Sequence, residues 1–461
     1  MKKFSLKHSF FFAIFISFSF AGNAQKQQSA TRPESPNIIV ILTDDAGYAD
    51  FGFQSDKLIP TPNIDVLQQN GVTFTQAYAT APNCSPSRAG LLTSCYQQRF
   101  GHEYNLVKPK PAESISIDSL GLPLSQKIIP EYLKIEGYAT AIIGKWHLGE
   151  LPYFHPLKRG FDHFFGTLEG DSYYLTGQAK KIERNYKKIQ PDSLPYLTDA
   201  FGDEAVSFIK KQKRPFFLYL AFNAPHVPLQ AREDYLKLYR KQFVDVKRAT
   251  NAAMIKSIDD NVGKILNVLQ EKNMLENTLI VFTNDNGGEI FLNGSSNLPL
   301  KGLKRMLYEG GIRVPMIIHW PKYIKGKKVS ETIVSTLDIL PTIIAAAKLK
   351  PETKKKMDGK NLLPLLKYGQ KLQNRSLYWR QGKIGAIRDG DWKLIYFNFK
   401  NCKPELYNIK SDINEIVDLS VKEPIVAGKL LKKYMKWQAD LISPLWTGGP
   451  TDEEVLKMYD K

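Results

Sequence analysis

Four apolar runs end in polar or charged residues, and this pattern restricts the possible folds of the chain more than any other feature. The runs span residues 37–42, 138–143, 216–222 and 278–283 and are rich in β-branched and aromatic residues. Uninterrupted apolar runs of this length are typical of parallel strands that are covered on both faces. The pattern therefore predicts an α/β fold with a large, mixed but mostly parallel sheet sandwiched by helices.

The polar residues after these runs are expected to form one composite site, because ligands of open α/β sheets bind at the carboxyl ends of the strands. In chain order they are Asp44, Asp45, Lys145, His147, His226, Asp285 and Asn286. Two adjacent carboxylates at the end of a buried strand are costly unless a hard cation such as a divalent metal neutralises them. A pair of solvated loop acids is the alternative interpretation of Asp44 and Asp45.

Residues 83–93 place a cysteine at the predicted start of a helix. Ser85 suits the N-cap, and Pro86 suits the first helical position. Cys84 would then lie just before the helix, where unpaired N–H groups and the helix dipole stabilise an anion. Arg88, about one turn further on, could fold back to the same point. The local pattern fits a buried structural cysteine equally well.

Several motifs in this chain resemble those of the type I sulfatases, which belong to the alkaline phosphatase superfamily. Cys-Ser-Pro-Ser-Arg-Ala-Gly-Leu-Leu-Thr at 84–93 resembles the signature of this family, and Gly-Lys-Trp-His-Leu-Gly at 144–149 and Pro-His-Val-Pro at 225–228 follow in the expected order. The segments 284–288 and 298–315 continue the likeness. The chain is similar to secreted bacterial carbohydrate sulfatases and arylsulfatases, which implies an alkaline phosphatase-like fold and hydrolysis of sulfate esters. Predicted export and the basic charge favour a sulfated glycan as substrate, and exo action is expected because such pockets are usually deep.

The resemblance also implies roles for individual residues. Cys84 is expected to be oxidised to formylglycine by a formylglycine-generating maturation enzyme, and Ca²⁺ is the expected cofactor. The implied catalytic residues are Cys84, Arg88, Lys145, His147, His226 and Lys304. The implied metal ligands are Asp44, Asp45, Cys84, Asp285 and Asn286. Lys145, His226 and Lys304 are also expected to bind the substrate.

His102 is a further candidate substrate contact. It belongs to the polar, aromatic segment 99–105, which follows the nucleophile closely in sequence. An ordinary surface loop explains this segment equally well.

The two ends of the chain differ from its middle in their residue patterns. Residues 1–24 combine a basic start, an apolar stretch at 10–20 and small residues at 22–24, which predicts a signal peptide and an exported protein, periplasmic or secreted. Residues 25–35 are polar and expected to be disordered. The catalytic domain is predicted over 36–360. Short strand-like runs and a helix predict a smaller C-terminal α+β subdomain over 361–461, and no membrane span is expected.

Charge and cysteine content limit the possible partners. The net charge of +18 suits anionic partners such as sulfated glycans, although a lysine-rich solvated surface would give the same value. The chain has no nucleic-acid-binding motif, so nucleic acid is not expected. Cys84, Cys95 and Cys402 are too few for a disulfide framework. Separate thiols are the simpler expectation, and pairing of Cys95 with Cys402 stays open.

Two other functions remain possible at this point. A phosphatase or phosphodiesterase of the same superfamily would use zinc sites rich in Asp and His with a Ser or Thr nucleophile, and only seven histidines occur in the chain. A non-catalytic glycan-binding protein would not require the complete set of metal, nucleophile and lysine residues. The sequence does not specify the sugar, the sulfate position or the oligomeric state.

Overall fold

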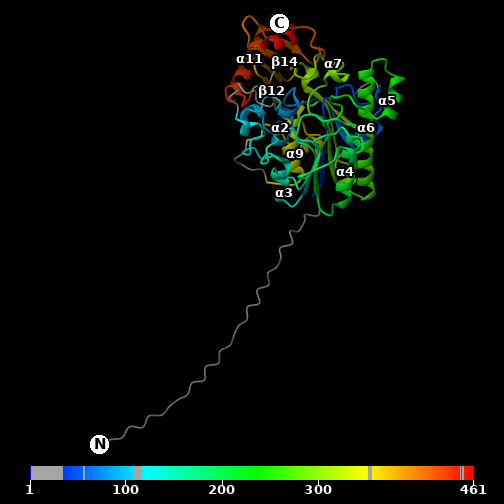
Figure 1. Ribbon diagram of the computed structural model, residues 1–461. Coiled ribbons are helices and arrows are strands. Elements are labelled where there is room, and N and C mark those ends of the chain that lie inside the picture. Colours follow the sequence, from blue (N-terminus) through cyan, green and yellow to red (C-terminus); the bar gives the residue numbers. More distant parts are fainter. Residues whose placement is uncertain are drawn as a thin grey trace.

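The computed structural model describes residues 35–54, 58–106, 116–350, 356–446 and 451–460, together with residues 1 and 448. The predicted signal peptide, apart from residue 1, and residues 25–34 lie outside the described residues. The chain forms a large body built on one sheet and a smaller part with its own sheet at one end of that body (Figure 1).

The large sheet has the strand order β10-β2-β9-β8-β1-β7-β3-β4-β5-β6, with β11 also paired to β2. Its central strands are the four predicted apolar runs: β1 (Asn37–Thr43), β3 (Ala139–Lys145), β7 (Phe216–Ala221) and β8 (Thr278–Asn284). β1 runs parallel to both β7 and β8, and β3 runs parallel to β7 and β4. The predicted mixed, mostly parallel sheet is therefore confirmed.

The remaining strands extend this sheet on both sides. β9 lies antiparallel between β8 and β2, and β4 leads to a short antiparallel pair. Their bounds are β2 (Gly71–Tyr78), β4 (His163–Thr167), β5 (Glu183–Arg184), β6 (Lys187–Lys188), β9 (Arg313–His319), β10 (Lys328–Ser330) and β11 (Val334–Ser335).

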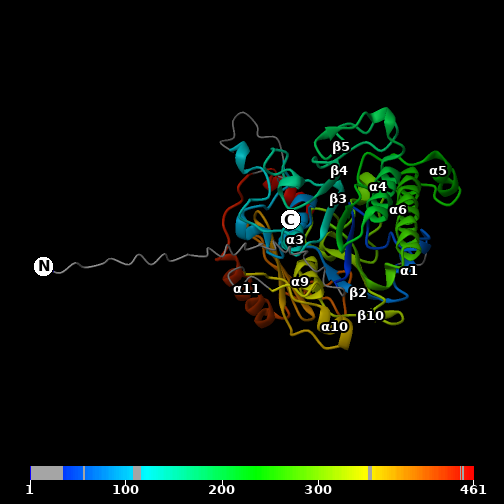
Figure 2. The same cartoon turned by 90° about the horizontal axis from the view of Figure 1, so that it is seen from below.

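Helices cover both faces of the sheet, as Figure 2 shows from below. One face carries α1 (Pro62–Val66), α4 (Leu197–Lys211), α5 (Glu233–Arg240) and α6 (Val246–Glu271). The other carries α2 (Cys84–Thr93), α3 (Ile129–Ile135), α9 (Ile339–Ala346) and α10 (Leu363–Tyr368). Side chains of β1 alternate between two cores: Ile39 and Ile41 pack on the α4/α6 side, and Ile38 and Val40 pack on the α2/α9 side. This two-sided burial explains why the strand sequence is apolar throughout.

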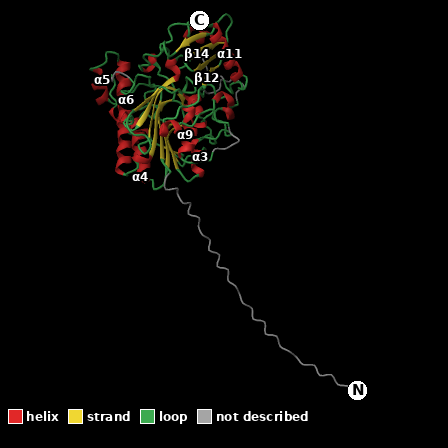
Figure 3. Cartoon of the chain, turned by 180° about the vertical axis from the view of Figure 1, so that it is seen from behind, coloured by secondary structure: helices red, strands yellow, loops and turns green. Residues whose placement is uncertain are grey.

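The smaller part is an antiparallel sheet of β12 (Ser376–Gln381), β13 (Ile384–Asp389), β14 (Trp392–Phe397) and β15 (Glu405–Asn408), packed against α11 (Pro424–Gln438) (Figure 3). It confirms the predicted α+β character of the C-terminal region. α12 (Asp452–Met458) follows near the end of the chain. Two very short helices, α7 (Ile290–Asn293) and α8 (Glu309–Ile312), flank a loop at the end of the large sheet.

Two smaller expectations also have outcomes. Cys95 and Cys402 form no disulfide. Within the described ranges, no helix combines the length and the apolar character needed to cross a bilayer.

Candidate active site

Helix α2 begins at Cys84, with Asn83 in extended conformation at its N-cap. The predicted N-cap position of Ser85 and first helical position of Pro86 are therefore wrong by two residues. The Ser85 hydroxyl has other partners: it donates to the carbonyl of His147 at 2.7 Å and lies 2.6 Å from Nε2 of His102. Ser85 thus connects the nucleophile helix to two other segments of the site.

The N-terminus of α2 receives its cap from a distant residue. The backbone N–H of Ser85 donates to Oδ1 of Asn105 at 3.0 Å, which is the bond that a capping side chain normally provides. Asn105 is in turn held by Trp446, whose Nε1–H donates to the carbonyls of Tyr104 and Asn105. The segment near the end of the chain therefore helps to fix the position of Cys84.

Replacing Asn105 by Ala should lower the free energy of unfolding by about 1 kcal/mol, because a helix N–H beside the nucleophile loses its acceptor. Urea denaturation followed by fluorescence would measure the change. Asn105→Asp is the matched control, since it keeps an oxygen at the same place and should retain most of the stability. Equal losses in both variants would contradict a capping role.

Both carboxylates at the end of β1 lie beside Cys84. Its Sγ is 3.4 Å from Oδ1 of Asp44 and 3.8 Å from Oδ1 of Asp45. Asp45 has φ 63°, a left-handed conformation that interrupts the alternation of the strand. Lys145 contacts Oδ2 of Asp44, and Lys304 donates to Oδ2 of Asp45 at 2.7 Å.

The charges of these lysines determine the ionisation of the two acids. Burial alone would raise the pKa of Asp44, but the charges of Lys145, His226, Arg88 and Lys304 together outweigh it and hold this pKa far below the usual range. Burial opposes Lys304 in the same way at Asp45, where the net shift of the pKa is also downward. Both acids are therefore anionic at neutral pH.

Arg88 contacts the acid at the end of β8. Its Nε and Nη2 donate to Oδ2 of Asp285 at 3.0 and 2.8 Å, and its Nη1 donates to the carbonyl of Lys145. Burial, together with the nearby charge of Asp44, raises the pKa of Asp285 to about 6. Arg88 thus holds together the ends of two strands and one turn of the nucleophile helix.

The three predicted histidines have different environments. His147 has φ 56°, so the segment from Lys145 to His147 is not extended, and strand alternation does not place these two side chains on one side. In this conformation the backbone N–H of His147 donates to the carbonyl of Leu168. Burial, followed by the charges of Lys145 and Arg88, holds the pKa of His147 well below its usual value.

His226 lies at the rim of the site, and His102 lies behind it. Nε2 of His226 is 3.5 Å from Oδ2 of Asp45, and its side chain is 15% exposed. Burial lowers the pKa of His226, and the charges of Asp44 and Asp45 oppose this shift. His102 is fully buried against Ser85 and the Trp446 ring, and burial lowers its pKa to about 3. The alternative of an ordinary surface loop for this segment is therefore wrong.

The residues present fit a divalent cation. Ligand atoms of Asp44, Asp45, Cys84 and His226 all lie within 4.8 Å of one another. Asn286 donates through Nδ2 to Asp45, while its buried Oδ1 has no hydrogen-bond partner among the residues that the structure describes. An unpartnered buried oxygen beside two carboxylates is suited to a hard cation. Asp285 lies outside the group of four.

Sequence reasoning did not identify the supporting residues. Asn293 donates to the carbonyls of Asp45 and, at 3.4 Å, Pro225, and Asn284 contacts Thr43 and donates to the carbonyl of Ala46. Asn284 immediately precedes the predicted ligand pair, so its position was a usable signal. Asn105 belongs to the candidate segment 99–105, but nothing there indicated its bond to Ser85, and Asn293 carries no local pattern.

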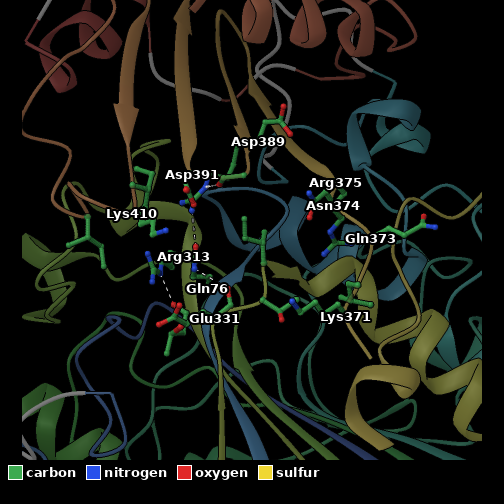
Figure 4. Close-up of a pocket in the computed structure, with 18 of the residues that line it drawn as sticks. Gln76, Arg313, Glu331, Lys371, Gln373, Asn374, Arg375, Asp389, Asp391 and Lys410 are labelled. Carbon is green, nitrogen blue, oxygen red and sulfur yellow. Dashed lines mark hydrogen bonds between the residues drawn. The ribbon is translucent and has the colours of Figure 1, made fainter. Parts of the chain in front are cut away.

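One cavity lies away from this cluster. Its volume is about 1050 Å³, and it lies between β2, β10 and the C-terminal sheet (Figure 4). Gln76, Arg313, Glu331, Lys371 and Lys410 are among its lining residues. Its described lining includes none of the predicted site residues.

Comparisons with known proteins identify the family of the chain. The sulfatase family model matches residues 36–349, and a model described as N-sulphoglucosamine sulphohydrolase, C-terminal, matches residues 303–438. Human (Homo sapiens) N-acetylgalactosamine-6-sulfatase is 34% identical over 394 residues, which cover 80% of this chain and 73% of that protein. Arylsulfatase J of Mus musculus is 30% identical over 482 residues, covering 89% of this chain and 78% of that protein.

A solved structure shows the same architecture. The crystal structure of Ps i-CgsB superposes with a TM-score of 0.83 at 37% sequence identity, covering 92% of this chain and 97% of that one. The resemblance identified from residues 84–93 is confirmed by these matches. The chain belongs to the sulfatase family, as a type I sulfatase of the alkaline phosphatase superfamily, and is a sulfuric ester hydrolase.

Proposed function

We propose that the protein removes sulfate esters from glycans by exo action, using a formylglycine made from Cys84 and calcium held by Asp44, Asp45, Asp285 and Asn286, with Cys84 as a further ligand. The main supporting observation is that Cys84, two carboxylates and two lysines meet in one buried cluster. When bound, calcium would supply Lewis-acid stabilisation of the sulfate oxygens. Lys145 and Lys304 would bind the remaining negative charge of the sulfate.

The proposed reaction has two steps. One hydroxyl of the hydrated aldehyde loses its proton to water and attacks sulfur, and the bond between sulfur and the sugar oxygen breaks. The protonated form of His226, which is 15% exposed and so can take up a proton from solvent, gives a proton to the departing oxygen. The second hydroxyl then loses its proton to His147, the bond between formylglycine carbon and sulfate oxygen breaks, and the aldehyde is restored. His147 suits this role because its lowered pKa keeps it neutral and because its Nδ1 has no partner in the described part of the chain. Arg88 orients the nucleophile.

The substrate class is proposed from relatives and from charge. Matched relatives are N-acetylgalactosamine-6-sulfatases, and Ps i-CgsB was solved in complex with k-i-k-neocarrahexaose. The net charge of +18 suits an anionic polymer. We propose a sulfated galactose or N-acetylgalactosamine unit as substrate, a formylglycine-generating enzyme as maturation partner, and export directed by the leader at 1–24.

Sulfate release measured by ion chromatography would test the function. The protein would be co-expressed with a formylglycine-generating enzyme, and mass spectrometry would verify conversion at Cys84. The substrates would be galactose 4- and 6-sulfate, N-acetylgalactosamine 6-sulfate, 4-nitrophenyl sulfate and 4-nitrophenyl phosphate. Preferential hydrolysis of the phosphate ester by fully converted protein would show that the reaction class is wrong.

Removing the metal should lower kcat/KM by about 100-fold or more, equivalent to about 3 kcal/mol of transition-state stabilisation. Dialysis against EGTA, followed by metal analysis and the same sulfate assay, would measure this loss. Added Ca²⁺ should restore the activity, and Mg²⁺ should restore less, because Mg²⁺ requires a more rigid octahedral site. Full activity in protein that contains no metal would contradict the proposal.

A further inference from the structure

Glu289 and Arg305 form a side-chain pair where three segments of the site meet. Glu289 follows the segment that contains Asp285 and Asn286, and Arg305 follows Lys304. The backbone N–H of Lys304 donates to the carbonyl of Gly288, which places the two segments side by side. The N–H of Arg305 donates to the carbonyl of Pro82 at 2.9 Å, two residues before Cys84. The pair is therefore connected to the metal, lysine and nucleophile segments together.

The pair connects the buried cluster to solvent. Nη2 of Arg305 donates to Oε2 of Glu289 at 2.7 Å; the Glu289 side chain is 5% exposed and that of Arg305 is 45% exposed. Burial raises the pKa of Glu289, and the charges of Arg305, Asp45 and Lys304 act on it. The carboxylate thus lies within the electrostatic field of the site, while the guanidinium is nearly half exposed and its charge also acts on Glu454.

The pair has unused hydrogen-bonding capacity. Across the described ranges, Glu289 is the one side-chain hydrogen-bond partner of Arg305, which leaves most of the five guanidinium donors available. Oε1 of Glu289 likewise accepts no hydrogen bond from any described residue. Arg305 also adopts φ 75°, a costly conformation for a residue with a long side chain and one that is often found at functional sites.

A second arginine–glutamate pair shows what a purely structural pair looks like in this protein. Arg184 is 46% exposed, nearly the same as Arg305, and binds Glu204 through both Nε and Nη2. Glu204 also contacts Nε2 of His163, so both of its oxygens are engaged. Within the described residues, Arg305 and Glu289 share only one hydrogen bond, so donors of the guanidinium and one carboxylate oxygen remain available for an additional ligand.

We infer that Glu289 and Arg305 bind a hydroxyl group on the sugar carbon next to the sulfate ester, with the carboxylate accepting its proton and the guanidinium donating to its oxygen. This inference rests on the proposed function. A carboxylate and a guanidinium side by side match a hydroxyl, which is both donor and acceptor. A site built to hydrogen-bond a hydroxyl discriminates strongly against substrates that lack it. The pair would therefore favour sugar sulfates over aryl sulfates.

The test compares kcat/KM for sugar and aryl sulfates in matched variants. Wild type, Glu289→Gln, Arg305→Ala and the control Arg184→Ala would be assayed with galactose 4-sulfate, galactose 6-sulfate, N-acetylgalactosamine 6-sulfate and 4-nitrophenyl sulfate. The ratio of kcat/KM for the best sugar to that for the aryl ester should fall by about 10-fold or more in Glu289→Gln and Arg305→Ala. Arg184→Ala should leave this ratio at the wild-type value.

The other possible outcomes would overturn the inference, the glycan substrate or the proposed function. An unchanged ratio in both site variants, whether or not total activity falls, would overturn the inference and leave the sulfatase function intact. Wild-type activity on the aryl ester alone would overturn both the inference and the glycan substrate. Absence of sulfate release from all four esters by converted wild-type protein would overturn the proposed function itself. Glu289→Gln is nearly isosteric, so its result stands even if Arg305→Ala folds poorly.

Discussion

Cys84→Ala should abolish sulfate release, with kcat/KM lowered by about 10⁴-fold or more. Cys84 is the first residue of α2, is 1% exposed and lies beside both Asp44 and Asp45. An alanine at this place cannot be converted to an aldehyde, so neither the attack on sulfur nor the release of sulfate has a nucleophile. Ion chromatography of sulfate would measure the loss on the best substrate of the panel.

Cys95→Ala is the matched control for this experiment. Cys95 is also buried and lies two residues beyond the other end of the same helix, where its Sγ contacts the carbonyl of Lys356 at 3.1 Å. Its loss should reduce stability modestly and leave kcat/KM within a few-fold of wild type. Activity of Cys84→Ala within 10-fold of wild type would show that the reaction does not proceed through Cys84. A similar loss in both variants would instead indicate a general effect on folding.

The central strands could be predicted closely because their signal is local. The run at 37–42 corresponds to β1, and the run at 278–283 corresponds to β8, each within one residue. A strand buried on both faces must be apolar along its whole length, so its limits can be read from the sequence alone. The same reasoning placed polar residues at the strand ends, and the structure brings Asp44, Asp45 and Cys84 together there.

The details of the site could not be predicted, because they depend on contacts between distant segments. Asp45 and His147 adopt left-handed conformations, which Asp and His adopt more often than most residues but which neither residue type requires. The start of α2 was misplaced because Ser85, a good capping residue, instead uses its hydroxyl to contact His102 and His147. Its N–H is capped by Asn105, twenty residues further along the chain. Local propensity cannot report a bond of this kind.

A buried ion cluster between the large sheet and the C-terminal sheet could not be predicted from the sequence either, because its members lie far apart along the chain. Lys393 of β14 lies 2.9 Å from Oε1 of Glu309 and 2.8 Å from Oε1 of Glu415, and all three side chains are fully buried. The backbone N–H of Glu309 donates to Oε2 of Glu415. Glu309 opens α8, five residues after Lys304, so this cluster also supports the loop that carries the proposed sulfate-binding lysine.

Replacing Lys393 by Met should lower the free energy of unfolding by about 3–5 kcal/mol, because two carboxylates would stay buried without their shared cation. Arg388 and Arg313, which also contact Glu309, would compensate only in part. Urea denaturation would measure the loss. Lys433→Met is the matched control: Lys433 pairs with Asp389 at the surface and is 52% exposed, so its removal should cost less than about 1 kcal/mol. Equal, small losses in both variants would show that Lys393 does not stabilise the cluster.

The same cluster should make stability depend on pH, with a sign set by Glu415. Burial raises the pKa of Glu415 from 4.5 to about 7, although Lys393 opposes this shift. Between these two values the folded state binds more protons than the unfolded state, so the free energy of unfolding should fall as pH rises, by about 3 kcal/mol at most. Glu309 contributes with the opposite sign at lower pH. Burial raises its pKa, but Lys393, Arg388, Arg313 and the hydrogen bond from Tyr78 together outweigh burial and lower this pKa to about 2.

Glu415→Gln isolates this contribution. The variant keeps the shape and hydrogen-bonding reach of the side chain and removes its titration, so the slope of stability against pH between 4.5 and 7 should be less negative than in wild type. Urea denaturation at several pH values would compare the two slopes. Identical slopes would mean that Glu415 has the same pKa in the folded and unfolded chain. In that case Lys393 would compensate fully for the burial of the ionised carboxylate. The loss of unfolding free energy in Lys393→Met should then be near the upper end of the predicted range of about 3–5 kcal/mol.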